Sequence, residues 1–175
     1  MVTTVRIHDP TVVVLIGPAG SGKSTLAGRH FEPAEILSSD AFRALVSGDE
    51  TDQSASRVAF RILHRELDRR LTAGLTTVID ATNARPDHRR PIVARARAAG
   101  AGTVAIVLDL EPAEVHDRNA SRTRVVDRVV VDRHLAAVRE TVDAGRLGLE
   151  GFSTVVVLRS TPEVDGLVIE RDPVP

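Results

Sequence analysis

Apolar and polar positions along this chain follow two alternating patterns. Short apolar runs predict strands, at residues 11–16, 35–39, 76–79, 103–110 and 152–158. Between them, apolar residues recur every three or four positions and predict helices, at residues 23–30, 40–46, 54–73, 87–99, 112–122 and 132–144. Strands that are apolar throughout are buried on both faces, and their alternation with helices is typical of α/β proteins. We therefore expect an α/β fold with a mostly parallel sheet of about five strands and helices on both faces.

The C-terminal segment, residues 161–175, predicts a short strand or turn followed by a proline-rich end. A length of 175 residues suits one domain with a single core, and the sequence contains no internal repeat. We place the domain at residues 1–170 and interpret residues 171–175 as a tail or the start of a linker. The chain is then expected to be the N-terminal module of a longer polypeptide.

The composition is that of an ordinary folded chain and argues against several kinds of function. A net charge of −1 and a pI near 6.6 give no basic surface of the kind found on typical nucleic-acid binders. Four phenylalanines without tyrosine or tryptophan make a stacking platform for a run of bases improbable. The absence of cysteine excludes disulfides and thiol catalysis, and the six histidines form no metal-binding pair. Because no apolar run is long enough to span a bilayer, we expect a cytoplasmic protein without membrane contact.

Candidate chemistry begins between the first predicted strand and the first predicted helix. The residues Gly17-Pro18-Ala19-Gly20-Ser21-Gly22-Lys23-Ser24-Thr25 match the phosphate-binding pattern G-x-x-x-x-G-K-[ST], the P-loop. Lys23 is the single lysine of the chain, beside 22 arginines. In this context backbone N–H groups converge on the phosphates, Lys23 reaches the β and γ oxygens, and the Ser24 hydroxyl binds Mg²⁺. The predicted ATP-binding residues of the loop are Gly17, Gly20, Ser21, Gly22, Lys23, Ser24 and Thr25.

A transfer enzyme also needs a carboxylate that orients or deprotonates the acceptor hydroxyl. Asp40 is the best-placed candidate, because it follows the second predicted strand at the sheet edge where ligands of open α/β sheets bind. The alternative is that Asp40 only caps the next helix. Arg43 lies three residues further on the same helical face, where it could hold an acceptor phosphate or be an ordinary solvated arginine.

Two further pairs of residues have open roles. Arg118 and Arg122 are four residues apart in a predicted helix, where they form either an arginine-bearing lid over the phosphates or part of a charged surface. Asp80 and Asp109 both end apolar strands and compete for the carboxylate that orients Mg²⁺-bound water; spacing does not choose between them. A guanine-reading Asn-Lys-x-Asp motif is excluded because Lys23 already belongs to the P-loop, so the chain is not a Ras-like GTPase.

Five blocks occur in a characteristic order and spacing. They are the P-loop, Ser-Ser-Asp-x-x-Arg at 38–43, Asp-Gln at 52–53, Asp-Ala-Thr-Asn at 80–83 and Arg-Asn-x-x-Arg at 118–122. Together they closely resemble the 5′-kinase module of bacterial polynucleotide kinase-phosphatases and, more loosely, the phage polynucleotide kinase. The resemblance extends over almost the whole chain. It implies a P-loop NTPase fold and a kinase that transfers the γ-phosphate of ATP, or of another NTP, to 5′-OH ends of RNA or DNA.

The resemblance also implies roles for residues on the acceptor side. Asp40 is similar in position to the general base that accepts the proton of the 5′-OH, and Arg43 to the residue that binds the phosphate 3′ of the terminal nucleoside. Gln53, Thr82 and Asn83 are similar in position to residues of the acceptor pocket.

On the donor side, the resemblance implies that Lys23, Arg118 and Arg122 act on the ATP phosphates, with the two arginines on a lid. It favours Asp80 over Asp109 as the carboxylate that holds Mg²⁺ or Mn²⁺ through water, beside Ser24. In the bacterial family the module heads a longer chain with phosphatase and ligase modules that repairs RNA. The present chain has no room for either, so the resemblance favours an excised domain over a stand-alone kinase.

Two other functions stay open. One is a P-loop kinase for a small molecule such as a sugar, an antibiotic or a nucleoside, in which Asp40 and Arg43 serve a different alcohol. The other is a non-catalytic, ATP-gated interaction module. The sequence chooses neither between RNA and DNA nor between donor bases, and it does not predict self-association.

Overall fold

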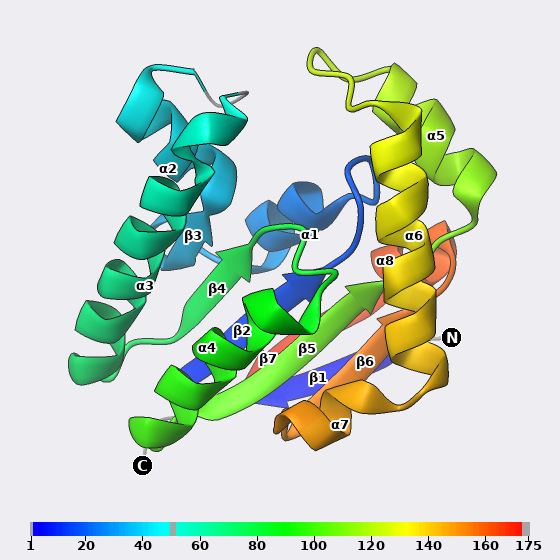
Figure 1. Cartoon of the computed structure of the whole chain (residues 1–175). Helices are drawn as coiled ribbons and strands as arrows, with labels where there is room; N and C mark the ends of the chain where they lie inside the picture. Colours follow the sequence, from blue (N-terminus) through cyan, green and yellow to red (C-terminus); the bar gives the residue numbers. More distant parts are fainter. Residues whose placement is uncertain (1, 50–51, 173–175) are drawn as a thin grey trace.

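The computed structural model describes residues 2–49 and 52–172, apart from the side chain of Gln53, and centres on a sheet of five parallel strands (Figure 1). In spatial order these are β3 (Ile36–Ser38), β4 (Thr77–Asp80), β2 (Thr11–Ile16), β5 (Gly102–Leu108) and β6 (Thr154–Leu158). Each overlaps a strand predicted from the sequence, so the predicted α/β class and parallel sheet are confirmed. β2 is buried along its whole length because β4 and β5 flank it and helices lie on both sides.

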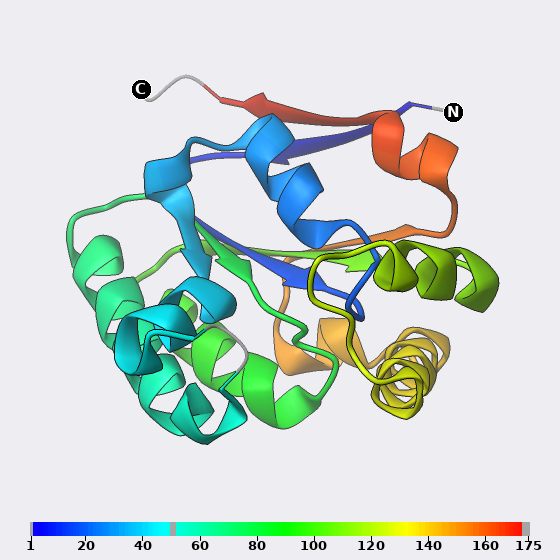
Figure 2. The same ribbon diagram turned by 90° about the horizontal axis from the view of Figure 1, so that it is seen from above.

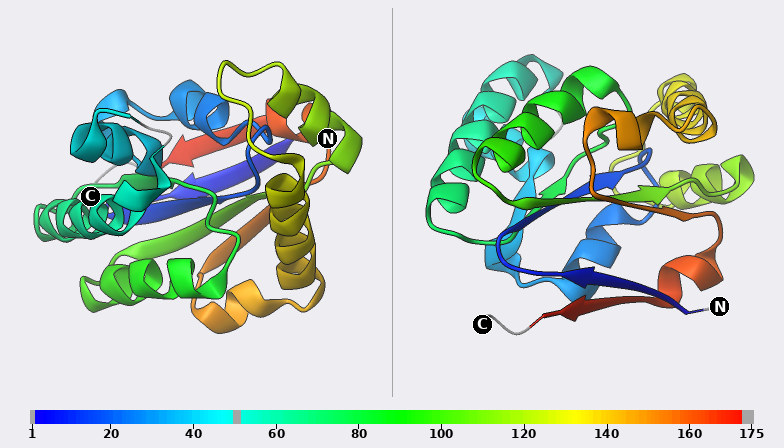
Figure 3. Two further views of the ribbon diagram at one scale, coloured as in Figure 1. Left: turned by 45° about the horizontal axis from the view of Figure 1, so that its top comes forward. Right: turned by 90° about the horizontal axis from the view of Figure 1, so that it is seen from below.

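Helices cover both faces of the sheet, as Figures 2 and 3 show from three further directions. One face carries α3 (Ser56–Thr72), α4 (Pro86–Ala98), α6 (Arg128–Asp143) and α7 (Arg146–Glu150). The other carries α1 (Lys23–His30), while α2 (Ser39–Ser47) packs against α3 and α5 (Pro112–Ala120) against α6. Short 3₁₀ turns lie at Pro33–Glu35 and Gln53–Ala55. In the described part of the chain, no helix combines the length and apolar character needed to cross a membrane.

The core has two halves, one on each face of the sheet, and β2 contributes to both. Its residues Val12, Val14 and Ile16 pack with the helices of the α3 and α4 face. Val13 and Leu15 point the other way and pack with α1. Because successive side chains of a strand alternate between faces, the unbroken apolar run of β2 supplies both halves at once.

A second, two-stranded parallel sheet joins the two ends of the chain, and the sequence analysis missed it. β1 (Thr3–Ile7) pairs with β7 (Leu167–Arg171), and α1 lies between this ribbon and the main sheet (Figure 2). Only Val5 and Ile7 of β1 are buried, so its apolar signal is too short to recognise as a run. Before β7, α8 (Thr161–Asp165) forms a helical turn where only a strand or turn was expected. Of the predicted tail, residues 173–175 lie outside the described residues.

The helix predicted over residues 112–122 is shorter than expected. α5 ends at Ala120, and α6 begins at Arg128 rather than at residue 132. The side chain of Asn119 explains this end: Nδ2 donates to the carbonyl oxygen of Val126 at 2.7 Å, and Oδ1 accepts from the backbone N–H of Val126 at 3.1 Å. This closes a loop and places Arg122 in a turn. The expectation that Arg118 and Arg122 share one rigid helix face is therefore wrong.

Candidate active site

The P-loop connects β2 to α1, and glycines set its path. Gly20 and Gly22 have φ of 84° and 95°, in the left-handed region that residues with a Cβ rarely adopt. A Cβ on Gly20 would lie 2.6 Å from the carbonyl oxygen of Val115, so α5 packs directly on the loop. At its start, the N–H of Gly17 donates to the carbonyl oxygen of Thr82 at 3.0 Å. The loop is thus held between α5 and the segment after β4.

Lys23 is buried at the base of the loop, with 9% of its surface exposed. Its Nζ donates to the carbonyl oxygen of Pro18 at 2.7 Å and to Ser21 Oγ at 3.5 Å, and it forms no ion pair within the described residues. Burial lowers the pKa of Lys23 to about 8, although the nearby carboxylates of Asp80 and Asp40 raise it. A buried ammonium that donates only to neutral oxygens is incompletely compensated, because these carboxylates form no ion pair with it. The site therefore fits an anionic phosphate.

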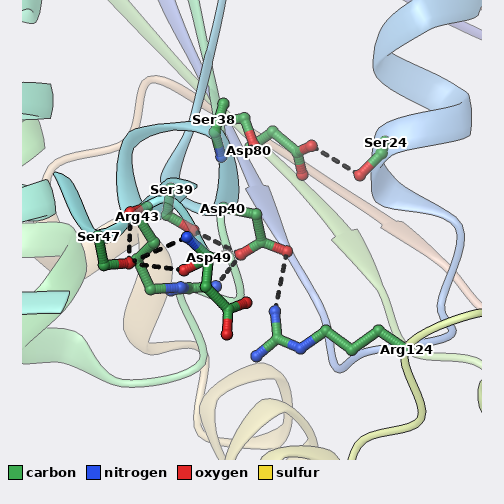
Figure 4. A network of polar contacts seen from close by, with 10 residues as sticks. Ser24, Ser38, Ser39, Asp40, Arg43, Ser47, Asp49, Asp80 and Arg124 are labelled. Atoms are coloured by element: carbon green, nitrogen blue, oxygen red, sulfur yellow. Dashed lines mark hydrogen bonds and ion pairs between the residues drawn. The ribbon is translucent and has the colours of Figure 1, made fainter. Parts of the chain in front are cut away.

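Ser24 and Asp80 meet at the carboxyl edge of the sheet. Ser24 Oγ donates to Asp80 Oδ2 at 2.7 Å (Figure 4). A hydroxyl and a carboxylate are oxygen ligands of the kind that Mg²⁺ takes, with water and substrate phosphates completing its shell. Asp109 lies elsewhere, 3.4 Å from Arg139 and 3.7 Å from Arg159, and burial raises its pKa. The geometry pairs Asp80, not Asp109, with the P-loop.

Asp40 lies in the first turn of α2, where its carboxylate contacts two guanidinium groups (Figure 4). Arg43, one turn along α2, binds Oδ1, and Arg124 Nη1 lies 3.7 Å from Oδ2. Ser38 is the cap of α2, because its hydroxyl accepts from the N–H of Ala41 at 3.4 Å, so the alternative in which Asp40 is the cap is wrong. The carboxylate lines the same cavity as Lys23. Asp40 is thus placed to meet a second substrate.

The two predicted lid arginines line this cavity from α5 and the turn after it. Arg118 contacts Glu114 at 2.5 Å, and its Nη1 lies 3.6 Å from the point that a Cβ on Gly22 would occupy. It therefore lies directly over the P-loop. Arg122 is exposed, and its charge is close enough to lower the pKa of Lys23. Both arginines therefore lie near the P-loop, although they do not share a helix face.

Arg124 is a site residue that the sequence analysis did not single out. In a continuous helix it would face away from Arg118 and Arg122, since it lies six and two residues from them. The turn closed by Asn119 brings it back to the cavity and to Asp40. In the sequence, Arg124 could have been noticed because it lies in the same arginine-rich stretch as Arg118 and Arg122. The direction in which its side chain points, however, depends on where α5 ends.

The segment after β4 carries Thr82 and Asn83, which also line the cavity. Asn83 is buried at a φ of 47°, and its Nδ2 donates to the carbonyl oxygen of Leu15 at 2.8 Å. Below it, fully buried Arg89 donates to the carbonyl oxygen of Asn83 at 2.9 Å and pairs with Glu150 at 2.5 Å. This buried ion pair, which the sequence analysis missed, fixes the segment beside the P-loop. The predicted acceptor roles of Thr82 and Asn83 stay predictions.

These elements enclose one cavity of about 1060 Å³, which is large enough for a nucleotide and part of a second substrate. P-loop residues, among them Gly20, Lys23 and Ser24, line it. Thr161 and Val164 line it near α8, and Phe60 and His88, whose rings are 5.7 Å apart, line it near α3 and α4. The side chain of Gln53, a predicted acceptor residue, lies outside the described residues.

The fold is like that of a P-loop kinase. Its parallel sheet carries the P-loop at the carboxyl end of the central strand β2, Ser24 pairs with Asp80, and Arg118 lies over the loop. Comparison with known families agrees. The model of the AAA domain family AAA_33 matches residues 12–144, and the chain belongs to this family. No curated protein matches the chain.

Solved structures share the fold at low sequence identity. A chain in the "Pnkp1/Rnl/Hen1 RNA repair complex" is 21% identical with a TM-score of 0.66, and the match covers 78% of this chain and 46% of that one. The present chain thus spans about half the length of that relative. A second structure of the complex matches at 25% identity and a TM-score of 0.55, over 69% of this chain and 41% of the other. A sugar kinase from Janibacter sp. HTCC2649 is 20% identical with a TM-score of 0.56, over 86% of this chain and 85% of that one.

Proposed function

We propose that this protein is an ATP-dependent polynucleotide 5′-hydroxyl kinase, which transfers the γ-phosphate of ATP to 5′-OH ends of RNA or DNA. The observation that carries the proposal is the shared cavity, which is lined by Asp40, by the P-loop lysine and by the arginines of the predicted lid, residues 118–124. Separate donor and acceptor groups around one space are what phosphoryl transfer requires. The five sequence blocks and the similarity to a chain of an RNA repair complex support a nucleic-acid acceptor.

In this proposal each residue has a role set by its position. Asp40 accepts the proton of the 5′-OH as the oxygen attacks the γ-phosphorus in line with the leaving ADP. Lys23, Arg118 and Arg122 stabilise the negative charge on the transferring phosphoryl group. Arg43 is assigned to the acceptor phosphate, although in the structure its guanidinium binds Asp40 and only 10% of its side chain is exposed. It would have to serve both groups.

Mg²⁺ or Mn²⁺ would be held by the Ser24 hydroxyl and, through water, by Asp80, and would neutralise charge on the β and γ phosphates. P-loop kinases as a class use ATP with Mg²⁺. The 2.7 Å contact between Ser24 and Asp80 supports this assignment, because it puts a hydroxyl and a carboxylate side by side. Thr25, exposed at the start of α1 and lining the cavity, is assigned to the α-phosphate.

We further propose that the predicted domain, residues 1–170, is the kinase domain. Its predicted boundary falls one residue short of the fold, because Arg171 is the last residue of β7 and pairs with Ile7 of β1. The chain spans only 46% of its relative in the RNA repair complex, which leaves room there for further modules. Phosphatase and ligase modules in the same native polypeptide are the partners implied by the sequence resemblance.

A small-molecule kinase is the second candidate, and one observation favours it. The sugar kinase from Janibacter sp. HTCC2649 matches over 85% of its own length, so this fold suffices for a kinase without other modules. In that case Asp40 would deprotonate a sugar alcohol instead of a nucleic-acid end. The acceptor, not the donor, separates the two candidates.

The deciding experiment offers γ-labelled ATP and Mg²⁺ to the protein with three acceptors: a 5′-OH oligonucleotide, the same oligonucleotide with a 5′-phosphate, and a mixture of sugars. We expect label on the 5′-OH oligonucleotide alone. Label on sugars with none on the oligonucleotide would replace the proposal by the second candidate. No transfer to any acceptor at saturating ATP would contradict both.

A further inference from the structure

The carboxylate of Asp40 is held on both of its oxygens, by residues from two different parts of the molecule (Figure 4). Oδ1 is bound by Arg43 and lies 3.4 Å from the Ser39 hydroxyl, and both of these residues belong to α2. Oδ2 faces Arg124, at 3.7 Å. Within residues 2–49 and 52–172, Arg124 is the side chain outside α2 that contacts this carboxylate. Arg43 can orient Asp40 only within its own helix.

Arg124 belongs to the same short segment as the donor-side arginines. Arg118 lies over Gly22 of the P-loop, Arg122 is close enough to affect Lys23, and Arg124 reaches Asp40. The turn fixed by Asn119 holds these three positions together, since its amide bonds the backbone of Val126 on the far side. One segment of the chain therefore contacts both the donor end and the acceptor end of the cavity.

We propose that Arg124 is a positioning residue that aligns the Asp40 carboxylate with the P-loop and ties that alignment to the lid. This inference rests on the proposed role of Asp40 as the base. Two guanidinium groups on opposite oxygens restrict rotation of the carboxylate, and a carboxylate oxygen has a further lone pair with which to meet the acceptor hydroxyl. Arg124 can thus stay in contact while Asp40 acts.

Arg124 differs from its neighbours in the step it should affect. Arg118 and Arg122 act on the ATP phosphates, so their loss should weaken ATP binding together with transfer. Arg124 points to Asp40, so its loss should disturb the alignment of the base while ATP still binds. Small misplacements of a reacting group cost up to about a hundredfold in rate. A partly exposed pair at 3.7 Å adds little to folding stability, so a large rate effect would not come from unfolding.

The test compares Arg124→Ala, Arg124→Lys, Arg122→Ala and a control, Arg128→Ala, in the full chain. Arg128 is exposed, begins α6 four residues further on, and does not line the cavity. For each variant we would measure kcat, KM for ATP and KM for the acceptor, with thermal unfolding recorded to show that the protein is folded. We expect Arg124→Ala to lower kcat by tenfold or more with both KM values within about threefold of the unmodified chain. Arg124→Lys should recover part of the loss, because it retains the charge.

Arg122→Ala should differ by raising KM for ATP, and Arg128→Ala should change nothing. An unchanged kcat for Arg124→Ala would overturn the inference. So would a rise in KM for ATP that matches Arg122→Ala, because Arg124 would then belong to the donor side. If the unmodified chain phosphorylates a sugar and not the oligonucleotide, the polynucleotide proposal fails. The comparison is then made with the sugar, because the contact between Arg124 and Asp40 is independent of the acceptor.

Discussion

In the proposed function the cavity has a donor half and an acceptor half, and the two are built in different ways. The donor half is one continuous stretch, Gly17–Thr25, whose backbone path follows from glycines at φ of 84° and 95°. The proposed acceptor half is assembled from side chains on separate elements: Asp40 on α2 and Arg124 after α5. A contiguous, backbone-built site can be recognised in a sequence as one motif, whereas a site assembled by tertiary contacts leaves only scattered candidates such as Asp40. The two halves should then also differ in how strongly single substitutions affect transfer.

The largest effect is expected at Lys23, the centre of the donor half. Lys23→Met should lower transfer by about a thousandfold or more, because the charge that meets the β and γ phosphates is lost. ATP affinity should fall as well. The measurement is labelled-phosphate transfer together with ATP titration. If Lys23→Met kept a transfer rate within tenfold of the unmodified chain, the contact of Lys23 with the phosphates would not be essential.

The same substitution should stabilise the unliganded protein. The pKa of Lys23 is about 8 in the fold, against 10.5 unperturbed, so at pH 7 folding costs on the order of 3 kcal/mol. Between about pH 8 and 10.5 the unfolded chain binds the proton that the folded protein has lost, and stability therefore rises with pH there. Lys23→Met should remove this rise and unfold at a higher temperature than the unmodified chain at pH 7. Equal stability at pH 7 would contradict the buried, uncompensated charge.

In the acceptor half, Asp40→Asn should leave donor binding intact. We expect transfer to fall between about a hundredfold and ten-thousandfold, the usual contribution of a general base, with ATP affinity nearly unchanged. Asp87→Asn is the matched control, because Asp87 lies in the first turn of α4, pairs with Arg85 and does not line the cavity. Full activity of Asp40→Asn would show that Asp40 is not the general base.

Asp80 contacts Ser24 of the P-loop, and the effect of replacing it should depend on the metal. Asp80→Asn should raise the Mg²⁺ concentration needed for half-maximal transfer by about tenfold to a hundredfold, as for other residues that orient a metal's ligands. Asp109→Asn is the control: it removes the other carboxylate that ends a strand, but one paired with Arg139 and Arg159 away from the P-loop. If the two variants shift the Mg²⁺ dependence equally, the geometric choice of Asp80 is wrong.

The contrast between the halves also describes what could be predicted from the sequence. The central strands β2, β4 and β5 were found because buried parallel strands are continuous apolar runs. The edge strands β3 and β6 are less buried but still contain short apolar runs. β1 was missed because it buries only two residues, and its pairing with β7 joins the two ends of the chain. Such a pairing has no local signal.

Within the site, the sequence could not show which direction Arg124 takes, because that depends on the side chain of Asn119 ending α5. The buried ion pair of Arg89 with Glu150 was missed for a similar reason. In the sequence both residues have the pattern of exposed helix residues, and their burial depends on tertiary packing. A charged residue in a helical pattern is normally a solvent-facing residue. Asp40 could be selected without the fold since it directly follows a strand, and its catalytic role stays a prediction.

The smallest expected effect tests whether the glycines of the donor half are special. Gly28 is exposed in α1, just past the P-loop, and nothing lies within 4 Å of a Cβ added there. Gly28→Ala should therefore raise the free energy of unfolding by about 0.5–1 kcal/mol, because alanine loses less backbone entropy in a helix, and transfer should be unchanged. Thermal unfolding and the transfer assay measure both quantities.

Gly20→Ala is the counterpart: its Cβ would lie 2.6 Å from the Val115 carbonyl oxygen at a φ of 84°, so both stability and transfer should fall. If Gly20→Ala were as stable and as active as Gly28→Ala, the path of the P-loop would not require glycine at position 20.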